Sequence, residues 1–249
     1  MAFYRFINKH YETSLNKDEI EEWLLENDIY DYNINDDLSV DVDNDVILND
    51  RELEKIPVQF NNVLGCFDVS HNNLLSLKGS PKKVKDFFDA SFNYLESLKY
   101  FPNFIGENIN VEGNNLTVLE YLPKIIRGSL VASANNIIGF LNPPKSIKGW
   151  IDLSHNRIHS LRSFPKIEGD IILSNNPLKF TIEELDKLNS KINGFLFLDK
   201  NLSILKDFYS ETTKDDNVMI TISQLRTLLL NEQINKQIPI NNKKITRKI

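Results

Sequence analysis

A repeat of 21 residues is the feature of this sequence that most limits its fold. Six segments align without gaps, and the spacing between them is 21 residues four times and then 20. A period in this range indicates one small structural unit per repeat, stacked on its neighbours, because such a unit does not bury its apolar face alone. The repeat therefore predicts one elongated domain. Each copy contains an asparagine at the same place, and these are Asn72, Asn93, Asn114, Asn135, Asn156 and Asn176.

Apolar residues recur at fixed offsets from each asparagine, in a frame L-x-x-L-x-L-x-x-N-x-L whose positions we number 1 to 11. In the first copy the frame reads Leu64, Phe67, Val69, Asn72 and Leu74. Positions 4 and 6 alternate with polar residues, as in a short strand with one buried face, so stacked copies predict a parallel sheet. The asparagine at position 9 follows the strand, where its amide can donate to and accept from buried backbone groups. We therefore predict that the asparagine column is structural.

The frame, its period and a proline at a fixed place on the return limb resemble the leucine-rich repeat over about residues 43–180. This resemblance implies an α/β solenoid, a curved array with a parallel β-sheet on its concave side and an irregular or 3-10 convex side. We expect helical caps at both ends. The shorthand S-x-N-x-L-x-S-L-x-x-x-P and the lead-in INDDLSVDVDNDVIL also resemble leucine-rich-repeat proteins of large tailed bacteriophages.

The segments that flank the repeats carry signals of capping structure. Asn16 and Glu19 fit a capping box at the start of a helix over about residues 17–27, and a hairpin is expected around the turn at residues 36–37. A degenerate repeat follows, with Arg51 where the asparagine is expected. We predict one continuous domain with an N-terminal cap at 1–42 (helix plus β-hairpin), repeats at 43–203, a C-terminal helical cap at 204–240 and a basic tail at 241–249.

A strip along the predicted concave face is the candidate binding site. Positions 3, 5 and 7 are expected to point outward, and they are acidic, include two aromatic residues and contain no lysine or arginine. Exposed aromatic side chains among polar groups are typical of binding hot spots, and a row of anions favours a basic partner. The residues predicted to contact the partner, with two histidines from position 8, are Asp45, Asp68, His71, Phe87, Asp89, Asn110, Glu112, Trp150, Asp152, His155 and Asp170.

Catalysis is not predicted. The triplet Cys66-Phe67-Asp68 resembles the Cys-x-Asp nucleophile of bacterial effector ubiquitin ligases that carry leucine-rich repeats, but in those proteins the motif lies in a separate helical domain. Here the triplet falls on repeat positions 3 to 5, with no evident basic neighbour to activate the thiol. The sequence also lacks a P-loop, a dinucleotide fingerprint, a Ser-His-Asp order and a histidine cluster. We therefore expect no enzyme and no cofactor.

A calcium loop is the one metal site that the sequence suggests. Asp41, Asp43, Asp45 and Glu52 stand at positions 1, 3, 5 and 12 of such a loop. Val46 occupies the place where the loop requires glycine, and the same stretch matches a strand and the first repeat. We predict no metal site, and calcium titration is left as the test.

A protein partner is the remaining class. The net charge of -6 argues against a dedicated nucleic-acid binder, and no apolar stretch is long enough to span a membrane. The start also lacks a signal peptide, so we expect a cytoplasmic protein, in the host bacterium if phage-encoded. We predict a non-enzymatic protein–protein interaction module, and the phage resemblance implies that it sequesters or inhibits a host antiviral-defence factor. The alternatives are a self-associating virion or assembly component and a DNA-mimicking inhibitor of a nucleic-acid enzyme.

Overall fold

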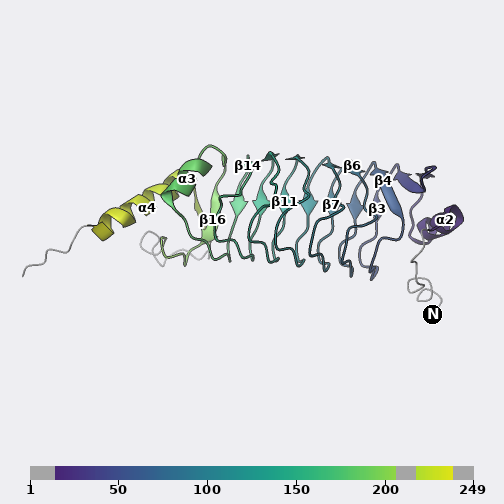
Figure 1. The fold of residues 1–249 in the computed structure, drawn as a ribbon, viewed down its shortest axis with the longest axis horizontal. Coiled ribbons are helices and arrows are strands. Elements are labelled where there is room, and N and C mark those ends of the chain that lie inside the picture. The colour runs from purple at the N-terminus through teal and green to yellow at the C-terminus, as the bar shows by residue number, and fades with distance from the viewer. Residues whose placement is uncertain (1–14, 206–216, 238–249) are drawn as a thin grey trace, which may run out of the picture.

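One short strand per turn builds a parallel sheet along the whole array (Figure 1). The computed structural model describes residues 15–205 and 217–237. Every strand of this large sheet pairs in parallel with the next, except the last two, which are antiparallel. From the N-terminal end the strands are β3 (Val46–Ile47), β5 (Phe67–Asp68), β7 (Phe88–Asp89), β9 (Ile109–Asn110), β11 (Leu130–Val131), β13 (Ile151–Asp152), β15 (Ile171–Ile172), β16 (Leu196–Asp199) and β17 (Asn217–Ile220).

The register of the large sheet follows the repeat. Phe67 pairs with Phe88 and Asp68 with Asp89, so equal frame positions lie side by side in neighbouring turns. Position 4 points into the core and position 5 lies on the outer face, because successive side chains of a strand alternate. This architecture is the leucine-rich-repeat type of solenoid that the sequence predicts. Position 1, which the sequence frame gives as leucine, does not belong to the core. Leu64 at this position is 49% exposed, so the frame needs no apolar residue there.

A second set of short strands lies on the return limb of the turns, just before the corner that leads into the large sheet, and its strands pair in parallel except for the first two, which are antiparallel to each other. The sequence predicts an irregular or 3-10 limb, and the limb is largely irregular, with no 3-10 helix assigned in residues 15–205. These small sheets contain β1 (Tyr32–Ile34), β2 (Ser39–Val42), β4 (Gln59–Val63), β6 (Lys83–Val84) and β8 (Phe104–Ile105) in one, and β10 (Ile125–Ile126), β12 (Ser146–Ile147) and β14 (Lys166–Ile167) in the other.

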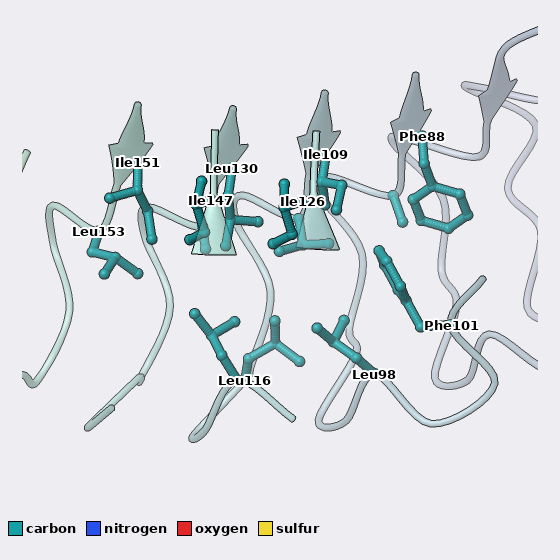
Figure 2. Close-up of a cluster of buried hydrophobic side chains, with 14 of the residues drawn as sticks. Phe88, Leu98, Phe101, Ile109, Leu116, Ile126, Leu130, Ile147, Ile151 and Leu153 are labelled. Carbon is teal, nitrogen blue, oxygen red and sulfur yellow. The ribbon is translucent and has the colours of Figure 1, made fainter. Parts of the chain in front are cut away.

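The core is a continuous apolar column enclosed by the large sheet, the small sheets and the rest of the return limb. Figure 2 shows Ile126 and Ile147 of the small sheet lying against the row formed by Ile109, Leu130 and Ile151 of the large sheet. All five are at most 1% exposed. Because each turn contributes one residue to each row, the stacking of turns buries what a single turn leaves open.

Helices lie at both ends of the array (Figure 1). Helix α2 (Lys17–Glu26) begins with the capping box of Asn16 and Glu19, and it buries Ile20 and Leu24. The hairpin of β1 and β2 follows, and it joins the small sheet through β2. At the other end are α3 (Ile182–Leu188) and α4 (Ile222–Gln237), which contact each other. Residues 1–14 of the expected N-terminal cap and the expected basic tail at 241–249 lie outside the described residues.

The asparagine column lies inside the turn that follows each large-sheet strand. All six side chains are at most 8% exposed. In each case Oδ1 accepts the backbone N–H of the residue two positions after the asparagine place of the preceding turn, as in the 3.0 Å bond from Leu95 to Asn114. Each Nδ2 donates to carbonyl groups of its own turn and of the preceding turn. The column therefore links every turn to the next through buried polar groups.

Candidate partner-binding face

The outer face of the large sheet carries the predicted binding residues, and we call its residues at frame positions 3 and 5 the acidic strip. Asp45 and Trp150 are exposed, and Asp68, Asp89, Asn110, Asp152 and Asp170 are partly exposed. Phe87 is half-buried, so Trp150, at 43% exposure, is the more accessible of the two predicted aromatic residues. Glu112 at position 7 is also half-buried, and the histidines His71 and His155 at position 8 are exposed beside the strip.

The serines at position 7 do not face solvent as the sequence predicts. Ser70 and Ser91 are only 6% and 3% exposed, respectively. The Oγ of Ser70 donates to Oδ1 of Asp68 at 2.7 Å, and the Ser70 N–H donates to the same oxygen at 2.9 Å. Asp89 and Ser91 repeat this arrangement. A short hydroxyl two residues after an aspartate bonds locally, so it packs against its own turn instead of extending outward.

The polar side chains at position 5 are therefore anchored by their own turn. Asp152 accepts the Ser154 N–H at 2.8 Å, and Asn110 accepts the Glu112 N–H at 3.1 Å through an amide oxygen. These bonds fix the direction of the carboxylates without removing their negative charge. A partner therefore meets carboxylates that are already oriented, which reduces the conformational entropy lost on binding.

Several position 3 side chains bond along the array. Asp45 Oδ1 accepts the Cys66 N–H at 2.8 Å, Asn108 Oδ1 accepts the Ser129 N–H at 2.8 Å, and Asp170 Oδ1 accepts the Phe195 N–H at 2.9 Å. Each bond runs to the same position one turn later. Asp45 and Asp170 consequently have a structural role in addition to the predicted contact with a partner.

Three apolar residues of this face were missed by the sequence reasoning. Phe195 occupies position 3 of the turn that follows the sixth copy and is 40% exposed. Met219 on β17 is 55% exposed. Phe92 occupies position 8, where it is 44% exposed and stacks on His71 with ring centroids 4.5 Å apart. Applying the frame beyond the sixth copy would have found Phe195, whereas Met219 comes from an antiparallel strand outside the repeat. Together with Trp150, Phe195 and Met219 give the C-terminal part of the face an apolar character.

Position 8 has an unusual backbone conformation throughout the array. The residue there adopts a positive φ, which permits the sharp turn into the asparagine but favours glycine or asparagine. This explains why side chains at position 8 project beside the strip. The column contains Asp50 (55°), His71 (53°), Phe92 (52°), Gly113 (64°), Ala134 (52°), His155 (54°) and Asn175 (57°).

Cys66 lies between two carboxylates. Its Sγ and the carboxylates of Asp45 and Asp86 offer atoms within 4.8 Å of one another, which among the described residues is the grouping that fits a metal ion. Burial and then the negative charge of Asp45 raise the pKa of the Cys66 thiol to about 11, although a backbone hydrogen bond at Phe87 acts in the other direction. The thiol is therefore protonated at neutral pH, which opposes both nucleophilic attack and thiolate coordination.

The acidic segment from Asp41 to Glu52 does not form a loop between helices. Asp41 lies on β2 and accepts hydrogen bonds from Asn35, Asn61 and Asn62 at 2.7–3.0 Å. Although burial alone would raise the pKa of Asp41, these bonds lower it below the usual value. The candidate calcium ligands are thus distributed over β2 (Asp41), the corner before β3 (Asp43 and Asp45) and the turn after β3 (Glu52), and Asp41 already accepts hydrogen bonds from amide groups.

None of the helices in residues 15–205 and 217–237 has the length and apolar character needed to cross a membrane. The fold and the polar sheet face together define a leucine-rich-repeat-type solenoid, an architecture that fits a protein-interaction module in general. Among solved structures, the chain is similar to a Shigella effector leucine-rich-repeat domain, with a TM-score of 0.48 and 18% sequence identity, over 78% of this chain and 94% of that domain. No family model and no curated protein matches the sequence.

Proposed function

We propose that this chain is a non-enzymatic protein-interaction module that binds a basic partner protein through the acidic strip. The observation that carries the proposal is the charge of this face: positions 3 and 5 hold five aspartates and no lysine or arginine in the turns from β3 to β15. Trp150 supplies an exposed aromatic anchor among these polar groups. An accessible tryptophan within a rim of fixed charges is the composition of a binding hot spot.

We infer that the partner is a host protein, and that the chain acts in the cytoplasm of a phage-infected bacterium to sequester a defence factor. The lead-in INDDLSVDVDNDVIL and the 21-residue repeat support this inference by their resemblance to phage repeat proteins. The chemistry of the face requires that the partner present lysine or arginine side chains beside an apolar residue. Association with such a partner is accelerated by charge and weakens with salt.

The test is a pull-down from bacterial host lysate with paired variants. Trp150→Ala and Asp152→Asn alter the face, and Asp152→Asn keeps the acceptor for the Ser154 N–H. The control is Tyr121→Ala, because Tyr121 is 52% exposed but lies outside the strip. We expect the partner to be recovered by wild type and by the control, with at least about tenfold weaker binding by Trp150→Ala. Equal recovery by all proteins would show that another surface binds.

The DNA-mimicking alternative is supported by one observation, the adjacent carboxylates of Asp68 and Asp89 on paired strands. If the captured partner is a nucleic-acid enzyme, duplex DNA should compete with the chain for it. Competition by DNA that disappears at high salt favours mimicry. If DNA does not reduce binding of the partner to the chain, mimicry is excluded.

A further inference from the structure

The small-sheet limb carries the opposite charge to the large-sheet face. Basic residues stand in and beside the short strands β6, β10, β12 and β14, and all of them are exposed. They come from repeat places 10 to 13 residues after the asparagines, so they recur in several turns. We call these residues the basic strip: Lys82, Lys83, Lys85, Lys124, Arg127, Lys145, Lys148 and Lys166.

Few carboxylates neutralise the basic strip. Glu168 pairs with Lys148 at 2.6 Å and with Lys166 at 3.8 Å, so one acid serves two lysines. Arg127 lies over the ring of Phe104, at 4.4 Å from its centroid. Lys83, Lys124 and Lys145 take part in none of the ion pairs found in residues 15–205 and 217–237. The strip is therefore a positively charged surface with most of its charge available.

The acidic and basic strips share one pitch. On the small sheet, the Lys145 N–H donates to the Lys124 carbonyl at 2.7 Å, so these two lysines occupy neighbouring turns. On the large sheet, Asp68 and Asp89 also occupy neighbouring turns. Both spacings equal the distance between adjacent strands, about 4.8 Å, because each sheet takes one strand from every turn. Charges on neighbouring turns therefore have the same spacing on both strips, although the acidic strip has no charge in the turns of β9 and β11 and the basic strip has none in the turn of β8.

We propose that two copies of this chain associate through unlike faces, with the acidic strip of one copy on the basic strip of the other. Such a contact leaves an acidic and a basic strip open at its two sides, so assembly continues beyond a dimer. The matching pitch favours a second copy over a nucleic acid, because phosphates advance by about 3.4 Å per nucleotide along each strand of a duplex and lose register with the lysines. This self-association is a property additional to the proposed binding of a host protein and does not depend on it.

The narrow, charged character of the two strips sets the strength of this association. Exposed ion pairs each contribute little, so the contact depends on several pairs acting together and weakens with ionic strength. The assembly is therefore concentration-dependent at low salt and dissociates at high salt. A partner protein that covers the acidic strip competes with it.

The test is sedimentation velocity on the purified full chain at about 20 mM and about 500 mM NaCl. We expect species heavier than the 28.8 kDa monomer at low salt and monomer at high salt. The triple variant Lys83→Glu/Lys124→Glu/Lys145→Glu should raise the dissociation constant at least about tenfold. Asp68→Asn/Asp152→Asn should act in the same direction, and Asn110 shows that asparagine is compatible with position 5.

A matched control variant separates the effect of charge in the basic strip from the effect of the net charge of the protein. Lys78→Glu/Lys99→Glu/Lys179→Glu changes the net charge equally at exposed lysines outside the basic strip, and it should associate like wild type. A monomeric wild type at low salt overturns the proposal, and so does equal loss in the control. Loss on deleting residues 238–249 alone would identify the tail as the occupant of the acidic strip and overturn it as well. Binding of single-stranded DNA without self-association would assign the basic strip to a polyanion. None of these outcomes decides capture of a host protein, which the pull-down measures separately.

Discussion

Removal of one asparagine from the buried column tests how the turns are held together. Asn114 Oδ1 accepts the Leu95 N–H at 3.0 Å, and its Nδ2 donates to the carbonyl groups of Ala90, Val111 and Glu112 at 3.0–3.2 Å. In Asn114→Ala the Leu95 N–H is left in the interior without this acceptor. The substitution costs less at the three carbonyl groups, because they have other donors: the Ala90 carbonyl, for example, still accepts a hydrogen bond from Asn93 Nδ2 at 3.3 Å.

The size of the effect follows from these contacts. One buried donor without a partner costs about 1–3 kcal/mol, and the loss of the three partly redundant bonds adds a smaller amount. We expect Asn114→Ala to lower the free energy of unfolding by about 2–4 kcal/mol. That is a large share of the total stability of about 5–15 kcal/mol that is typical of folded proteins.

Urea unfolding followed by far-UV circular dichroism measures this difference. Asn115→Ala is the control, because Asn115 is exposed and the substitution keeps the backbone N–H that donates to the Leu95 carbonyl. The control should stay within about 0.5 kcal/mol of wild type. If Asn114→Ala unfolds at the same urea concentration as the control, the column does not stabilise the array, and the structural assignment of all six asparagines is refuted.

Three further predictions concern the backbone and the thiol. Gly169→Ala should destabilise by about 1–3 kcal/mol in urea unfolding, because the new Cβ would lie 2.6 Å from the Gly149 carbonyl oxygen. Ala134→Gly should raise the thermal midpoint, because a φ of 52° strains alanine, whereas Ala132→Gly, at the buried position directly after β11, should lower it. Native Cys66 should react with iodoacetamide at pH 8 about a hundredfold more slowly than the unfolded chain, since its pKa is raised to about 11 from 9.0. The same shift predicts that stability falls as pH rises from 9.0 towards 11, and equal labelling rates would contradict both statements.

The large sheet was predictable because its signal is repeated. Positions 4 and 6 are apolar in all six copies, the residue between them is polar in four, and the asparagine sets their register. The small sheet was not predictable in the same way, since each of its two-residue strands buries only one side chain, such as Val84 or Ile147. One buried residue per strand recurs in every repeat but gives no alternation within the strand, so the strand is recognised only when the neighbouring turns supply hydrogen-bond partners.

The binding face was predictable in position but not in detail. Alternation places positions 3 and 5 outside, yet it does not show that Ser70 bonds to Asp68 or that Asp45 bonds to the next turn. Both are local preferences of short polar side chains, which compete with exposure to solvent. The basic strip was missed because its lysines are spread over several offsets, and only the fold shows that these offsets share one limb.

The negative charge of the strip exceeds what the fold requires. At position 5, Asn110 accepts the N–H of the residue two places on, as Asp68 and Asp152 do, so an amide oxygen suffices for this bond. Charge at Asp68 also opposes folding, because Asp89 lies beside it on the paired strand and like charges in direct register repel.

Asp68→Asn should therefore stabilise the protein by about 0.2–1 kcal/mol at low ionic strength, and the gain should vanish at high salt. Urea unfolding at both salt concentrations measures this, and the pull-down should show weaker capture of the partner by the same variant. Destabilisation by Asp68→Asn would mean that the charge serves the fold. Opposite effects on stability and on binding would mean that the carboxylate is retained for a partner at a cost to the solenoid.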